Sequence, residues 1–200
     1  MSVDLEASLA RPISLAEMVT AARATLAELL GLDTTPELSV FTDRRYEQGR
    51  RVASGRRLDE AELRSTTIGD PIEREPNGMP GSIHLEIDVS GFADGAWLLV
   101  IDHETETGGV PEAVFSPYRT CVSVVVALAM ALAVADLTGG EFTDDQIRLL
   151  RPGHTHPRHM VTATRLPRES GDFAQRCERY LRQFAHLGGW PRDVAMERRA

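Results

Sequence analysis

The sequence predicts an α+β fold: a mainly antiparallel sheet packed by an N-terminal amphipathic helix and a long buried helix, with another amphipathic helix near the C-terminus. Three patterns indicate these elements. Apolar residues recur at helical spacing over residues 15–30, alternate with polar residues over 82–90, and form an almost unbroken run over 117–137. The 200 residues, of which 42% are hydrophobic, are enough to bury a sizeable core.

The first helix has a recognisable start and stop. Ser14-Leu15-Ala16-Glu17 fits a capping box, in which the serine oxygen and the glutamate each satisfy a backbone N–H. Gly31 is placed to end the helix. The apolar stripe between them needs a partner surface and consists of Leu15, Met18, Val19, Ala22, Leu26, Leu29 and Leu30.

A short strand is expected over Leu38 to Thr42. Residues 44–57 then contain six arginines with closely spaced acidic neighbours. We interpret this stretch as a solvated, partly ion-paired loop or hairpin rather than a phosphate-binding patch, because Tyr46 is its only aromatic residue. Prolines and glycines predict a long loop over residues 71–81.

The clearest strand is Ser82 to Ser90, and Ala96 to Asp102 forms a second strand after a turn. Pairing Ser90 with Ala96 puts three apolar residues of each strand on the core face: Leu85, Ile87 and Val89 beside Ile101, Leu99 and Trp97. In this register His84 and Asp102 are cross-strand neighbours on the solvent face. A further strand is expected over residues 110–115.

The run from Pro117 to Leu137 predicts the long buried helix. Ser116 suits its N-cap, Pro117 its first turn and Gly139-Gly140 its stop. The valines alone would favour a strand, but the alanines of 127–135 favour a helix more strongly. Because its charge-free part is shorter than the roughly 20 residues of a membrane span, we expect it in the core.

The C-terminal quarter differs from the rest in charge. Residues 1–150 have 12 arginines against 25 acidic residues, a balance of −13, whereas residues 151–200 have 10 arginines against 5 acidic residues, a balance of +5. We interpret residues 1–150 as a single acidic domain in which 141–150 form a short amphipathic turn or helix. Residues 151–200 are then a basic linker, 151–169, and a final helix ending at Gly188-Gly189, packed on the same domain.

Composition also limits the cellular context and the chemistry. The start of the chain lacks the pattern of a signal peptide, and only two distant cysteines are present, so we expect a cytoplasmic protein with reduced thiols. All 22 basic residues are arginine, which excludes a lysine Schiff base and a lysine-containing P-loop. No motif indicates a cofactor, and the acidic balance disfavours nonspecific binding to nucleic acid or a membrane surface.

Two groups of residues are candidate sites. The solvent face of the predicted hairpin has His84, Glu86 and Asp88, with Asp102 and Glu104 at its end, and we interpret it as an acidic surface for binding a partner. The alternative is a His84–Asp102 pair acting as a general base, but no nucleophile is marked beside it.

The other candidate is a speculative metal site of three histidines in the linker: His154, His156 and His159. No further ligand with a recognisable spacing lies nearby, and the arginine- and proline-rich surroundings favour an exposed segment. Cys121, in the first turn of the long helix, could have a lowered pKa, but burial as a small core side chain is the favoured interpretation.

The sequence thus favours a non-catalytic protein that binds another protein, in particular a basic one. An immunity-type or antitoxin-like inhibitor is one concrete version, because an acidic surface speeds capture of a cationic partner. The alternative is a small hydrolase or metal-dependent enzyme that uses His84 with Asp102 or the three histidines. A homodimer through exposed parts of the first or last helix is a third hypothesis.

Overall fold

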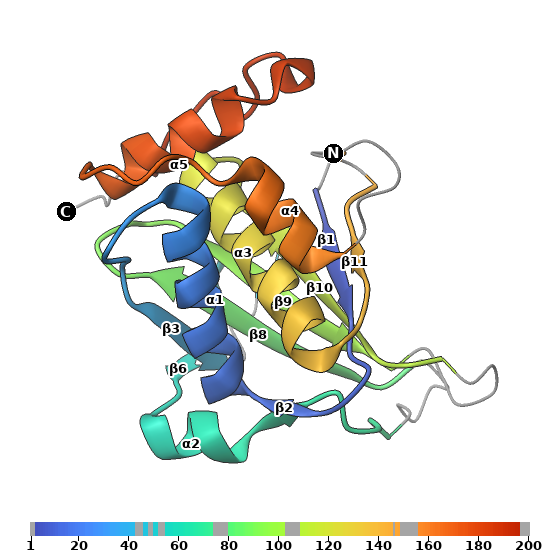
Figure 1. Ribbon diagram of the computed structural model, residues 1–200. Helices are drawn as coiled ribbons and strands as arrows, with labels where there is room; N and C mark the ends of the chain where they lie inside the picture. The colour runs from blue at the N-terminus through green and yellow to red at the C-terminus, as the bar shows by residue number, and fades with distance from the viewer. Residues whose placement is uncertain are drawn as a thin grey trace.

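The computed structural model describes residues 3–42, 46–47, 50–51, 55–73, 80–102, 109–145, 147–148 and 156–196. Over these residues the protein has the predicted α+β fold. A seven-stranded antiparallel sheet lies behind a group of helices in Figure 1, and the main core lies between them.

The sheet has β9 as its middle strand. The order is β11-β1-β10-β9-β8-β3-β6, with bounds Phe142–Thr143, Leu5–Ser8, Glu112–Pro117, Gly95–Ile101, Ser82–Val89, Leu38–Thr42 and Arg56–Arg57. Two short antiparallel pairs lie outside it: β2 with β7, Ile13–Ser14 and Thr67–Ile68, and β4 with β5, Tyr46–Glu47 and Arg50–Arg51. Strand β1 has no counterpart in the sequence prediction, because four residues give too short an alternation to recognise.

Helix α1, Leu15–Leu30, confirms the first predicted helix and both of its ends. The Ser14 hydroxyl accepts from the Glu17 N–H, and the Glu17 carboxylate accepts from the Ser14 N–H. Gly31 follows in the left-handed conformation at φ 60°. The apolar stripe is buried against α3, except that Val19 is only partly buried.

Helix α3, Cys121–Thr138, is the long core helix, but it begins four residues later than predicted. Pro117 ends β10, paired with Ala96, and the N-cap is Thr120, whose hydroxyl accepts from the Ser123 N–H. The strand extends further because Ser116 and Pro117 still have a partner in β9. By length and composition α3 could cross a membrane, but 89% of it is buried inside the protein, as in a core helix.

Helices α4, Pro157–Thr164, and α5, Phe173–Arg182, lie over α3 and α1 on the side away from the sheet (Figure 1). The prediction of a linker over 151–169 was therefore wrong over residues 157–164. Pro157 occupies the first turn of α4, where a missing N–H costs nothing, and so it starts a helix rather than breaking one.

Two other predictions need correction, and one helix had no counterpart in the prediction. The final helix ends at Arg182, and a 3₁₀ turn, Ala185–Leu187, follows it before Gly188. Residues 142–143 form edge strand β11 instead of part of a helix, because β1 offers them a backbone partner. Helix α2, Glu60–Ser65, follows the arginine-rich stretch and is capped by Asp59 and Glu62.

The hairpin of β8 and β9 has a different register from the predicted one. Ala96 pairs with Ile87 rather than with Ser90, so the two strands are offset by three residues. An odd offset exchanges the faces of β9: Ala96, Leu98 and Val100 are buried, and Trp97 points to the other side. The physical cause lies in α3, which packs closely on β9 and β10 and leaves room there for small side chains such as Ala96 and Ala113.

The turn before β9 is fixed by a buried carboxylate. Asp94 is 1% exposed and accepts from the Thr120 and Ser123 hydroxyls at 2.5 and 3.0 Å. Its other oxygen accepts from the Met196 N–H at 2.8 Å. The carboxylate therefore joins the turn before β9, the first turn of α3 and the C-terminal segment. Its negative charge also interacts favourably with the positive N-terminal end of the helix dipole.

Candidate functional site

The sheet face opposite α1 and α3, called the open face below, is the candidate site. Over the part of the chain that the structure describes, the large helices all lie on the other side of the sheet. Cross-strand register places side chains from the five central strands on the open face. They are Glu6 and Ser8 of β1, Glu112, Val114 and Ser116 of β10, Trp97, Leu99 and Ile101 of β9, Ser82, His84, Glu86 and Asp88 of β8, and Ser39 and Phe41 of β3.

An apolar stripe runs along the middle strand of this face. It consists of Trp97, Leu99 and Ile101, and Trp97 is 47% exposed, an unusual value for so large an apolar side chain. Val114 of β10 lies directly opposite Leu99 and widens the stripe. Interface centres are enriched in such aromatic and aliphatic groups.

Acidic side chains lie on both sides of the stripe. On one side, Glu112 is opposite Ile101 in the register and Glu6 is opposite Val114. On the other, Glu86 is opposite Trp97 and Asp88 is opposite Gly95. The basic group that the register places on this face among the described strands is Arg57, at the outer strand β6 opposite Phe41. The open face therefore combines an apolar centre with carboxylates on both sides, and each of these carboxylates already has an interaction within the protein.

Trp97 belongs to an ordered polar and aromatic cluster. Its indole meets the Tyr118 ring nearly at a right angle, with centroids 5.8 Å apart. The Tyr118 hydroxyl donates to Glu86 Oε1 at 2.6 Å, and the Glu86 side chain is only 3% exposed. In the same row Ser116 faces Trp97 from β10, and its hydroxyl donates to the Asp4 carboxylate at 2.5 Å.

The structure separates the predicted acidic residues. His84, Glu86 and Asp88 share the open face, where His84 is exposed and its Nε2 is 3.2 Å from the Ser82 hydroxyl. Asp102 is buried, and its carboxylate accepts from the Ile72 N–H at 3.1 Å. The predicted His84–Asp102 pair was wrong, because in the observed register Leu99 is opposite His84. Glu104 lies outside the described residues.

Two of the three linker histidines are described, and they lie in and beside α4. His156 is the N-cap of this helix, and its Nδ1 accepts from the Arg158 N–H at 3.3 Å. The His159 ring is 5.2 Å from it, and both rings are exposed. Among the described residues no group of three histidine, cysteine or acidic side chains is arranged to hold a metal ion, and His154 lies outside them.

Both thiols are buried in the helical layer. Burial raises the pKa of Cys121, although the nearby Arg182 guanidinium opposes this effect. Burial also raises the pKa of Cys177 well above its usual range. The position of Cys121 at the start of α3 therefore does not make it a reactive thiolate.

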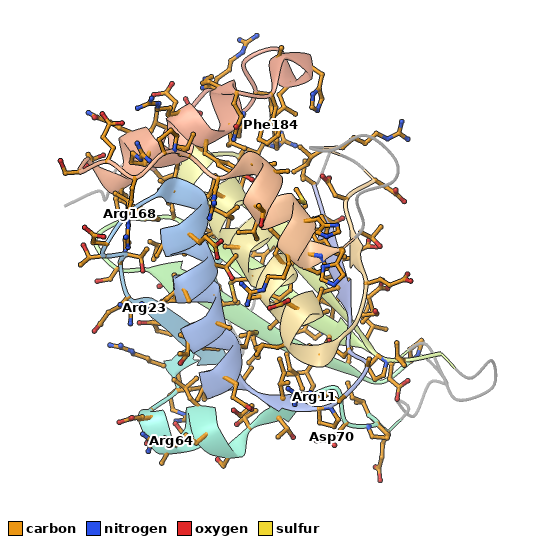
Figure 2. All side chains as sticks on the ribbon, in the orientation of Figure 1. Arg11, Arg23, Arg64, Asp70, Arg168 and Phe184 are labelled. Atoms are coloured by element: carbon orange, nitrogen blue, oxygen red, sulfur yellow. The ribbon has the colours of Figure 1, made fainter. Side chains whose placement is uncertain are left out.

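The concave regions beside α1 do not coincide with any predicted site. One, of about 670 Å³, lies between α1 and residues 165–168. The other, of about 380 Å³, lies between α1 and residues 33–35. Arg23 and Arg168 lie at this margin in Figure 2, and Arg168 pairs with Asp33 at 3.2 Å in full contact with solvent. Such exposed pairs indicate an ordinary solvated surface.

Sequence reasoning missed the contributions of Trp97 and Tyr118 to the open face. Trp97 was predicted to lie on the core face because the predicted register paired Ser90 with Ala96, and Tyr118 was expected inside a helix. The alternation of β9 alone fits either face, since nearly all of its residues are apolar. Comparison with protein-family models, curated proteins and solved structures found no match to this chain.

Proposed function

We propose that this protein is a non-catalytic binding protein whose open face engages a basic region of another protein. The observation that carries the proposal is the exposed stripe on the middle strand, with Trp97 at its end and carboxylates on both sides. Tryptophan and tyrosine dominate the centres of protein interfaces, and a charged surround sets partner choice and association rate.

Charge supports a basic partner rather than a second copy of this chain. Residues 1–150 have a balance of −13, and the open face is mainly acidic, so two open faces would repel each other. A basic surface would gain attraction from the same groups. An immunity- or antitoxin-like inhibitor of a basic enzyme is the concrete form that we propose.

The enzymatic alternative receives less support. Its His84–Asp102 pair is separated, and neither concavity beside α1 is lined by these residues or by the histidines of α4. Catalysis by such a pair requires hydrogen-bond reach between the two groups.

The test compares two variants with the same change in charge. Glu6→Arg/Glu112→Arg reverses two carboxylates of the open face, and Glu37→Arg/Glu60→Arg reverses two exposed carboxylates elsewhere. Partners captured by wild-type protein are purified, and their association is measured at low and high salt. We expect the open-face variant to associate about tenfold more slowly at low salt and the control variant to match wild type.

Equal association by the two variants would contradict the proposal, and so would a partner without a basic surface. Matching melting temperatures establish that both variants are folded. Light scattering of the unmixed protein addresses the homodimer, and a stable dimer that buries the open face would also overturn the proposal.

A further inference from the structure

Charge alone indicates only that a partner of the open face is basic. At one place on this face the contacts also indicate which chemical group of the partner binds. This place is the cluster of Trp97, Tyr118 and Glu86, which joins β9, the segment after β10, and β8. The inference drawn from this cluster rests on the proposed binding role of the open face, and it specifies which chemical group of the partner binds there.

The first relevant property is order. Tyr118 is held at both ends, by the ring contact with Trp97 and by the 2.6 Å hydrogen bond to Glu86. Glu86 is itself 3% exposed within a strand that is paired on both sides. A cluster that is already ordered loses little conformational freedom when a ligand binds.

The second property is the combination of an aromatic surface with negative charge. Trp97 is 47% exposed, and indole is the aromatic group that attracts cations most strongly. In the cross-strand row that contains Trp97, Glu86 lies on one side, and Ser116, bonded to Asp4, lies on the other. The row therefore has a carboxylate on each side of the indole, Glu86 and Asp4, and both are already bonded within the protein.

We propose that this cluster binds an arginine side chain of the partner protein. The guanidinium group is planar, weakly hydrated and able to stack on an indole, and the nearby carboxylates of Glu86 and Asp4 would attract its charge without a direct hydrogen bond. A lysine ammonium group is more strongly hydrated and has no flat face, so it fits the same cluster less well.

The test uses the full chain with Trp190→Phe, so that Trp97 is the only tryptophan and reports its own contacts by fluorescence. The probe is a twelve-residue peptide of alternating glycine and arginine. The control peptide has citrulline in place of arginine, which keeps the planar shape but removes the charge and replaces one donating nitrogen with a carbonyl oxygen. A lysine version tests the preference for guanidinium.

We expect the arginine peptide to change Trp97 fluorescence in a saturable way and to bind at least fivefold more tightly than the lysine peptide. The citrulline peptide should cause no saturable change in Trp97 fluorescence. In calorimetry, Trp97→Leu should weaken binding about tenfold, while Trp97→Phe should retain much of it. Tyr118→Phe, which removes only the hydroxyl bonded to Glu86, should weaken it severalfold. Val110→Ala is the matched control, because Val110 is exposed to the same 47% but lies outside the strand pairing.

Equal affinity for the arginine and citrulline peptides would overturn the inference, as would unchanged binding by Trp97→Leu. These failures are distinguishable from failure of the proposed function. If Trp97→Leu binds normally and Glu6→Arg/Glu112→Arg does not, the open face binds cations but the Trp97 cluster is not the arginine site. If neither variant affects a purified partner, the open face is not the binding surface.

Discussion

Replacing Asp94 tests whether a buried carboxylate holds the hairpin turn, α3 and the C-terminal segment together. Asp94→Ala removes three hydrogen-bond acceptor contacts: those to the Thr120 and Ser123 hydroxyls and to the Met196 N–H. It also removes a negative charge from the N-terminus of an 18-residue helix.

The size of the effect follows from these contacts. Each hydrogen bond to a charged group contributes about 1.5–3 kcal/mol. The hydroxyls of Thr120 and Ser123 also form a hydrogen bond with each other, and this bond remains when Asp94 is replaced. Adding the helix dipole, we expect Asp94→Ala to lower the free energy of unfolding by about 3–5 kcal/mol. For a chain of 200 residues this lowers the melting temperature by about 10 °C. Asp94→Asn keeps one carbonyl acceptor, so we expect it to lose about 1–2 kcal/mol.

Urea unfolding followed by circular dichroism measures both variants. The control is Asp33→Ala, which removes an equally charged side chain from an exposed pair and should change stability by about 0.5 kcal/mol or less. If Asp94→Ala costs no more than Asp33→Ala, the Asp94 contacts do not hold the turn, the start of α3 and the C-terminal segment together.

Three further predictions concern other buried contacts. Neither Cys121 nor Cys177 should react with iodoacetamide in the folded protein, because both are buried and burial raises the pKa of each; rapid labelling under native conditions would contradict this. Burial also raises the pKa of Tyr180, so the folded state keeps its proton longer than the unfolded state. The contribution of Tyr180 to the free energy of unfolding should therefore be fully present below about pH 10, where an unfolded tyrosine titrates, and should fall above that pH. If a Tyr180→Phe variant loses stability above pH 10 just as steeply, Tyr180 is not the cause. Gly140→Ala should destabilise the protein, because its Cβ would lie 1.9 Å from the Ser8 carbonyl oxygen. Thermal melts compare it with Glu141→Ala, a change at the neighbouring exposed position.

The candidate site was predictable only in part. Glu86 and Asp88 are on the open face because β8 alternates clearly, and one buried face dictates the direction of every second residue. Trp97 was not predictable, since β9 is apolar on both faces and its direction depends on the offset from β8. Asp102 illustrates the same limit. Its strand was recognised, but its buried carboxylate depends on Ile72, thirty residues away.

The sequence by itself determined the fold class and helix α1 with both ends, because these features depend on local spacing and local caps. By length and composition α3 could also cross a membrane, and it is the 89% burial of the helix in the structure that assigns it to the core. The tertiary structure decided where α3 begins, how β8 and β9 pair, and therefore which side chains form the open face. Pairing register depends on contacts between distant segments, here the close packing of α3 on Ala96 and the seat of Asp94 at its N-terminus. Local propensity contains no information about such contacts.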